Sequence, residues 1–285
     1  MKTAPPNSPL PVQPAPEILD RELEPLLAEP FAGARVVGEP ADPHAARLRE
    51  KLAARTGASL RAEAGMVTAR ARRAQRVQIG EGVTTRELYR APDPERLRPG
   101  EPIRVALIAL AAGAVYRHRR DAARLHREWL VVSGSARLDG EKLGLRDYRA
   151  LPAGFDDGEW HSDEGASLFV RESSLSPAIG DAPFTVRDAD AGWADLTSRI
   201  RRRVLWQRDG QAAMLYFADP GASVPVHTHG HDEECLMLQG ELFLDDVLLQ
   251  PGDYQIAPAG GGHRITETDT GAVIYAHGDL NLHFT

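Results

Sequence analysis

The stretch that decides the fold reads HTHGHDEE at residues 227–234, and PAGGGH follows at residues 258–263. Alternate residues of a β-strand face the same side, so the first two histidines can direct their imidazoles to one point. The first glutamate follows within reach, and the last histidine returns after a turn-rich stretch. Three imidazoles and one carboxylate are typical ligands of a first-row transition metal. We therefore predict a metal site formed by His227, His229, Glu233 and His263.

The region around this stretch occurs twice in the chain. Residues 134–154 and 240–260 align without gaps, and 9 of their 21 positions are identical, which gives a repeat period of 106 residues. From about residue 76 onward, short apolar runs are separated by Gly, Pro and Asp, a pattern typical of an all-β protein. The repeat therefore predicts two tandem β domains, at 76–175 and 186–285, joined by a linker at 173–184.

The first 75 residues have a different composition. Residues 1–16 are rich in proline and are predicted to form a disordered tail. Apolar residues at helical spacing predict helices at 18–27 and 43–64, so we interpret residues 17–75 as a helical N-terminal segment.

Nine positions of the second copy carry a resemblance to a known family. The patterns G-x5-H-x-H-x3-E-x6-G from Gly221 and G-x5-P-x-G-x2-H from Gly252 resemble the two signature motifs of the cupin superfamily. The doubled acid followed by CLMLQGE is similar to the ChrR-like cupins, a family of the anti-sigma factor type. The resemblance implies an all-β fold class with two tandem cupin (double-stranded β-helix, or jelly-roll) barrels after the short helical segment. It also implies zinc on the four residues predicted above.

One feature of that family is missing. Its anti-sigma domain holds a second zinc with a histidine and a Cys-x-x-Cys pair, whereas residues 1–75 contain one histidine, His44, and no cysteine. That second zinc site cannot form in this chain, so the resemblance supports the cupin fold more strongly than anti-sigma activity.

The first copy lacks the intact set of ligands. The gapless register puts Arg127 at the position of Glu233, and an arginine opposes the binding of a cation. We interpret the first copy as structural. The alternative that stays open is a rearranged metal site built from four side chains, namely His118, His126, Glu128 and His161.

Three further residues near the predicted site have two readings each. His231 is either a loop residue near the opening or a fifth ligand or proton carrier. Glu234 points away from Glu233 by strand alternation, which predicts a structural hydrogen bond or a surface charge. Cys235 shares the parity of Glu233 and is expected to be a buried core residue rather than a redox sensor.

Three functions fit these residues. The first is a regulatory or sensor protein that binds a small molecule or an oxidant at the metal and signals through its N-terminal helices to a protein partner. The second is an oxygenase, a dioxygenase-type enzyme on Fe, Mn or Ni with Glu233 as a base. The third is a purely structural Zn site. Whether the chain is an enzyme stays open, and a homodimer is a further expectation.

The composition limits the remaining classes of partner. A net charge of −7 and a pI of about 5.8 disfavour nucleic acid and anionic membranes, which reward a basic face. No segment approaches the roughly 18 consecutive apolar residues of a membrane-spanning helix. Cys235 is the single cysteine and no signal peptide is visible, so we expect a cytoplasmic protein without disulfides.

Overall fold

The structure is a computed structural model that describes residues 65–118, 124–156, 158–174 and 182–284, together with four helical residues, Arg47, Glu50, Lys51 and Ala54. The chain divides into two compact units, residues 1–54 and 55–285. The tail expected at 1–16 and the helices expected at 18–27 and 43–64 lie outside the described residues, apart from these four. Within the described ranges, no helix has the length and apolar character needed to cross a membrane.

The N-terminal barrel is built from two antiparallel sheets. Its strands are β2 (Arg76–Gly80), β3 (Val83–Arg90), β4 (Pro102–Leu110), β5 (Ala114–Arg117), β6 (His126–Gly134), β7 (Ala136–Leu138), β8 (Glu141–Leu143), β9 (Tyr148–Leu151), β10 (Glu159–Ser162), β11 (Ala166–Ser173) and β12 (Phe184–Val186), with a short 3-10 helix η1 (Pro94–Arg96) between β3 and β4. Seven strands form one sheet in the order β12-β9-β6-β11-β4-β3-β2, and four form the other in the order β5-β10-β7-β8. Apolar side chains of both sheets share one buried core.

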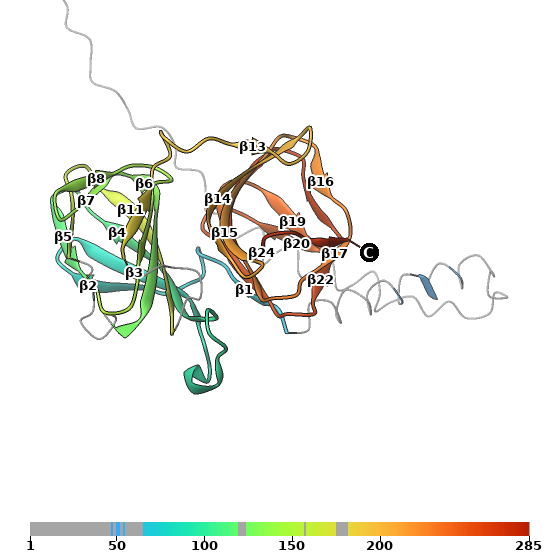
Figure 1. Cartoon of the computed structure of the whole chain (residues 1–285), viewed down its shortest axis with the longest axis horizontal. Coiled ribbons are helices and arrows are strands. Elements are labelled where there is room, and N and C mark those ends of the chain that lie inside the picture. The colour runs from blue at the N-terminus through green and yellow to red at the C-terminus, as the bar shows by residue number, and fades with distance from the viewer. Residues whose placement is uncertain are drawn as a thin grey trace, which may run out of the picture. The chain divides into compact units, whose positions relative to one another are not determined.

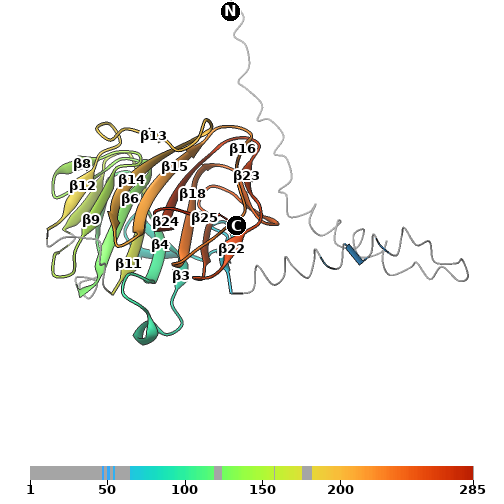
Figure 2. The same cartoon turned by 45° about the vertical axis from the view of Figure 1, so that its right-hand side comes forward.

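The C-terminal barrel repeats this plan. Its strands are β13 (Ala194–Asp195), β14 (Ile200–Arg208), β15 (Gln211–Ala218), β16 (Ala222–Val224), β17 (His227–Thr228), β18 (Glu233–Gly240), β19 (Leu242–Leu244), β20 (Val247–Leu249), β21 (Tyr254–Ala257), β22 (Gly262–His263), β23 (Thr266–Thr268), β24 (Ala272–Asp279) and β25 (His283–Phe284), and they are joined by β1 (Val67–Ala69). The sheets have the orders β1-β21-β18-β24-β15-β14-β13, β16-β23-β19-β20 and β22-β17-β25. Figure 1 shows the two barrels, and Figure 2 shows the curved sheets from a second side. The expected fold class, all-β with two tandem barrels, is confirmed.

The repeat is visible in the backbone of both barrels. Asp139 and Asp245 occupy equivalent tight turns with φ of 49° and 54°, a conformation that aspartate tolerates better than most residues. Gly134 and Gly240 also have positive φ, and a Cβ at Gly240 would lie 1.9 Å from the carbonyl oxygen of Gly271. The identities in the sequence therefore mark turns that both barrels need.

Each barrel includes one strand from the segment of chain that leads into the other barrel. Strand β1 precedes the N-terminal barrel but pairs with β21, and β12 pairs with β9. Two equivalent ion pairs secure these strands, Arg70 to Asp253 at 2.8 Å and Arg187 to Asp147 at 3.0 Å. We expect residues 67–69 in the helical segment and residues 184–186 around the end of the linker, whereas both form strands. Three-residue strands are too short to show a periodic pattern, and their pairing partners are distant in the chain.

The two large sheets pack against each other over a shared apolar core. This core includes Leu130 and Phe169 from one barrel and Leu236 and Tyr275 from the other. The rings of Phe169 and Tyr275, which are equivalent in the repeat, have centroids 5.1 Å apart. The face of each large sheet that points away from this core lines the interior of its own barrel.

Candidate metal centre in the C-terminal barrel

Three short elements bring the predicted ligands together. Strand β17 pairs with β22 so that His227 lies opposite His263. The backbone of His229 is held by the loop that leads to β22, because its N–H donates to Gly261 at 3.0 Å and its carbonyl accepts from Gly260 at 2.7 Å. Glu233 is the first residue of β18. The turn-rich PAGGGH stretch is therefore a positioning element for two of the histidines.

The donor atoms of these side chains converge. Ligand atoms of His227, His229 and Glu233 all lie within 4.8 Å of one another. The Oε2 atom of Glu233 lies 3.1 Å from Nε2 of His229 and 3.3 Å from Nε2 of His263. The centroid of the His229 ring lies 5.1 Å from those of both other imidazoles. The structure thus brings His227, His229 and Glu233 into one group that could hold a metal, and His263 lies beside Glu233.

Contacts outside the cluster orient two of the three imidazoles. The Nδ1–H of His227 donates to the carbonyl of Pro225 at 2.8 Å, and that of His263 donates to Asp245 at 3.2 Å. Such bonds fix the ring and leave Nε2 as the donor atom toward a metal. Asp245 is the positive-φ turn residue, and its other oxygen accepts from the backbone of Arg264 at 2.8 Å. The repeated turn therefore also serves the cluster.

The environment of the His229 ring shows whether this cluster fits a metal. Its side chain is buried, and neither ring nitrogen has a hydrogen-bond partner among the described residues. The 3.1 Å approach of Nε2 to Glu233 lacks the geometry of a hydrogen bond. Burial lowers the pKa of His229 and keeps the imidazole neutral, with an unused lone pair. A buried donor atom without a partner is costly, and a bound cation would satisfy it.

The surrounding charges favour a cation at this point. Burial raises the pKa of Glu233, but the hydrogen bond from His263 and the nearby imidazoles outweigh burial, and the net pKa is below its ordinary value. Burial lowers the pKa of His263, but the carboxylates of Glu233 and Asp245 outweigh it and raise the net value. The carboxylates therefore stabilise positive charge here, whether it comes from a proton or from a metal ion.

A cavity of about 280 Å³ opens beside the cluster and reaches it at His227, Glu233 and His263. Most of the other lining residues are apolar, among them Leu242, Leu244 and Ile274. Space next to this possible metal cluster leaves room for a further molecule.

Comparison with known proteins agrees with this geometry. Residues 181–281 match the profile of the ChrR cupin-like domain family. Over these residues the chain has a ChrR-like cupin domain. No curated protein sequence matches the chain.

Solved structures share the fold of both cupin barrels. A proposed dioxygenase from Nostoc punctiforme has 15% sequence identity and a TM-score of 0.58, with 75% of this chain and 83% of that chain covered. Oxalate decarboxylase from Bacillus subtilis has 16% identity and a TM-score of 0.56, with 77% of each chain covered. Oxalate decarboxylase from Lactobacillus farciminis has 16% identity and a TM-score of 0.52, with coverage of 76% and 87%. At these identities the likeness establishes the bicupin fold.

The other candidates of the ChrR-like barrel lie around the cluster in different roles. His231 bonds through Nδ1 to Asp279 and lines a separate pocket, so the structure does not make it a fifth ligand. Cys235 is buried and lines the cavity. Burial and the charge of Glu233 raise its thiol pKa, which keeps it protonated and unreactive, in accord with the predicted core role. Glu234 makes buried hydrogen bonds, as predicted.

The first cupin barrel does not assemble the alternative site. His118 lies between Glu172 and Tyr116, at 2.6 Å from each. The Arg127 guanidinium binds the carbonyls of Leu125 and Phe155.

The other members of that alternative set also point elsewhere. His126 is buried, and burial lowers its pKa to about 4. Glu128 faces the other barrel, and His161 is partly exposed beside Asp163. Trp129 and Trp160 fill the interior, with ring centroids 5.1 Å apart. The four side chains of the alternative set are therefore not brought together, because aromatic residues occupy the equivalent space.

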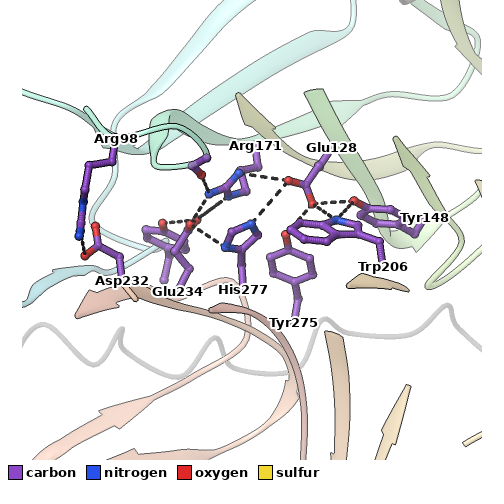
Figure 3. A network of polar contacts seen from close by, with 11 residues as sticks. Arg98, Glu128, Tyr148, Arg171, Trp206, Asp232, Glu234, Tyr275 and His277 are labelled. Carbon is purple, nitrogen blue, oxygen red and sulfur yellow. Dashed lines mark hydrogen bonds and ion pairs between the residues drawn. The ribbon is translucent and has the colours of Figure 1, made fainter. Parts of the chain in front are cut away.

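A buried polar network joins the two barrels (Figure 3). Its central residue, Arg171, is not among the candidate residues predicted from the sequence. Arg171 binds Glu234 through Nε at 2.9 Å and Nη2 at 2.7 Å, and Glu128 through Nη1 at 3.1 Å. Tyr148 donates to Glu128 at 2.6 Å, and Tyr254 donates to Glu234 at 2.8 Å. A signal was available, because the 106-residue register pairs Glu128 with Glu234 and also Arg171 with His277.

The charges of this network are strongly perturbed. Burial alone would raise the pKa of Glu128, but Arg171 together with the nearby imidazoles and the Tyr148 hydroxyl outweighs burial and lowers the value to about 2. Burial lowers the pKa of His277 to about 4, and Arg171 adds to the effect. His277 is therefore neutral at neutral pH, and the network holds two carboxylates against one guanidinium.

Proposed function

We propose that the C-terminal barrel binds one divalent transition metal through His227, His229, Glu233 and His263, and that the chain is a sensor of the ChrR-like type for a small molecule or an oxidant. The observation that carries the metal site is the convergence of these donors on His229, whose buried nitrogens have no other partner among the described residues. A bound metal would supply a Lewis acid and an attachment point for a ligand in the adjoining cavity.

The chain's own residues give the metal its setting. Asp245 and the Pro225 carbonyl hold two imidazoles, and Glu233 supplies the negative charge. Imidazole with carboxylate suits Zn, Fe, Mn and Ni, and zinc is our first expectation because of the ChrR-like match. Manganese has a precedent in this fold, since Bacillus subtilis oxalate decarboxylase has Mn(II) centres.

A sensor also needs a connection from the site to the N-terminal segment, and strand β1 supports one. Glu233 pairs with Ala257 on β21, and the neighbouring Ile256 pairs with Val67 on β1. A displacement of Glu233 on ligand binding would therefore reach the start of the described chain across one strand. We propose that the segment before β1 contacts a protein partner and that this step controls it.

Elemental analysis of the purified full chain tests the metal site. Wild type should retain about one metal per chain, and His229→Ala and Glu233→Gln should lose it together with thermal stability. His231→Ala is the matched control, because this neighbouring histidine bonds to Asp279 and lies in another pocket. Equal metal content in wild type and in both cluster variants would refute the site.

Hydrogen exchange tests the sensor. Metal removal should change the exchange of residues 65–70 more than that of residues 126–134 in the other barrel. Equal responses of the two segments would contradict a path through β1.

The cavity favours a second function, a dioxygenase-type enzyme, over a closed structural zinc site. Space beside the cluster could admit a substrate, and the fold resembles the proposed dioxygenase from Nostoc punctiforme. Glu233 would then act as a base. Oxygen consumption by the Fe(II)-loaded chain would favour the enzyme, and its absence with every candidate metal would favour the sensor.

A further inference from the structure

The cavity next to the metal cluster contains a cation that nothing in the cluster explains. Arg202 lies on β14 and lines the cavity with Tyr216 on β15, its direct partner across the strands. The guanidinium donates to the carbonyl of Leu280 and to the Tyr216 hydroxyl. Within the described residues, no carboxylate lies within ion-pair distance of Arg202.

The neighbouring arginines of β14 are neutralised, which makes Arg202 unusual. Arg201 lies 3.5 Å from Asp219, and Arg203 binds Asp188. These two point to the opposite face of the sheet by strand alternation, where Arg201 covers the ring of Phe217 at 4.1 Å. Arg202 is the arginine of the three that faces the barrel interior.

A partly buried guanidinium in an apolar cavity favours an anion. Moving a charge out of water is costly unless an opposite charge meets it, and guanidinium pairs well with the planar carboxylate group. Tyr216 supports the same anion, because burial is the main cause that raises its pKa and keeps its hydroxyl protonated. The hydroxyl donates to the Met214 sulfur at 3.4 Å, and a thioether is a weak acceptor that a carboxylate can replace. One cation and one hydroxyl match one carboxylate.

The rest of the wall defines the body of the ligand. Leu196, Ile200, Leu242, Leu244 and Ile274 give the cavity apolar sides. Outside the metal cluster, a second carboxylate of the ligand would find no second cationic side chain among the described lining residues. The volume of about 280 Å³ is roughly twice that of a cavity that holds benzene, about 150 Å³, so the body can contain about ten non-hydrogen atoms.

We infer that the ligand of this cavity is an apolar monocarboxylate, whose carboxylate binds Arg202 and Tyr216 and whose aliphatic or aromatic body fills the space toward the metal cluster. This inference rests on the proposed function, because it assigns the ligand class of the same site. It also separates this chain from the oxalate decarboxylases that share its fold. Oxalate has two carboxylates and no apolar body, so it is a poor match for this wall.

Calorimetric titration of the full chain with matched pairs of probes tests the inference. Octanoate should bind more tightly than 1-octanol, and benzoate more tightly than benzyl alcohol, by about 10- to 100-fold, which is the usual worth of a hydrogen bond to a charged group. Octanoate should also bind more tightly than oxalate. Equal affinity of acid and alcohol, or tighter binding of oxalate, would overturn the inference.

Variants then identify the cation responsible. Arg202→Gln should remove the preference for the acid, and Arg202→Lys should keep part of it. Arg201→Gln is the matched control and should leave the preference unchanged. An unchanged preference in Arg202→Gln, for instance because the metal alone holds the carboxylate, would overturn the assignment of Arg202.

The metal content of each sample separates this inference from the proposed function. Loss of the acid preference with metal retained contradicts the ligand class alone. If the wild-type chain contains no metal but octanoate still binds more tightly than 1-octanol, only the proposed function is contradicted. The ligand class would then stand, since Arg202 is not a member of the metal cluster.

Discussion

Replacement of Arg171 by methionine should destabilise the protein more than any exposed arginine replacement. The Arg171 side chain is 1% exposed and lies between two buried carboxylates, Glu128 and Glu234. Without the guanidinium, both carboxylates keep only hydrogen bonds from neutral donors. Removal of one partner from a buried ionic set costs about 3–5 kcal/mol, because an uncompensated charge is left behind.

The perturbed pKa of Glu128 gives a similar magnitude. Its carboxyl has a pKa of about 2 against an ordinary 4.5, because Arg171 and the smaller effects of the nearby imidazoles and the Tyr148 hydroxyl together outweigh burial. At about 1.36 kcal/mol per unit, the shift corresponds to about 3 kcal/mol of stability above pH 4.5. This stability is lost as the pH falls from 4.5 toward 2. In Arg171→Met the pKa should rise, so the deficit against wild type should be smaller at pH 5 than at pH 7.

Urea denaturation of the full chain measures this effect. Arg171→Met should lower the midpoint with little change of the slope. Arg137→Met is the control, because that side chain is 46% exposed and lies 3.7 Å from Asp163, and it should cost less than about 1 kcal/mol. Adding Glu128→Gln and Glu234→Gln to Arg171→Met should recover much of the loss. An Arg171→Met midpoint equal to that of the control would refute the reasoning.

Three further perturbations test other parts of the structure. His277 has a pKa of about 4 against 6.5, so its contribution to stability is present above pH 6.5 and lost toward pH 4. His277→Gln should reduce this decline by about 3 kcal/mol when denaturation is measured at a series of pH values. An unchanged decline would contradict the burial of a neutral imidazole. Gly240→Ala puts a Cβ 1.9 Å from a carbonyl oxygen and should cost more than about 2 kcal/mol of stability in thermal denaturation. Gly260→Ala is the control, because Gly260 has a similar φ and open space around it, and it should cost about 1 kcal/mol. Equal losses would argue against the close approach at Gly240. Arg70→Ala removes the ion pair to Asp253 and should speed amide hydrogen exchange at residues 67–69. The free energy of unfolding of the barrel should fall by less than about 1 kcal/mol. Unchanged exchange would show that the strand pairing alone holds β1.

The cluster could be predicted because its signals are local. His227, His229 and Glu233 lie within seven residues, so a short stretch of chain brings them close together. His263 is more distant, but it follows the repeated turn Pro258-Ala259-Gly260, and the repeat identified that turn. The two barrels followed from the same repeat.

The polar network could not be predicted in the same way. Arg171 follows the apolar run 168–170 directly, where a charged residue usually marks the end of a buried strand. Its burial depends on Glu234, 63 positions further along the chain. The interior of the first barrel poses a similar problem, since Trp129 and Trp160 pack together from strands that are separate in the sequence. Both arrangements depend on which faces meet in three dimensions.

Two adjacent acids connect the candidate metal centre to the interface between the barrels. Glu233 faces the cluster, and Glu234, the next residue of β18, faces Arg171 of the other barrel. Both residues lie on β18, which pairs with β21 and with β24. The hydrogen bonds of Glu234 to Arg171 and Tyr254 therefore anchor the residue next to Glu233. The first barrel thus keeps the scaffold of the repeat, and its Arg171 helps to hold the strand that carries the proposed metal ligand.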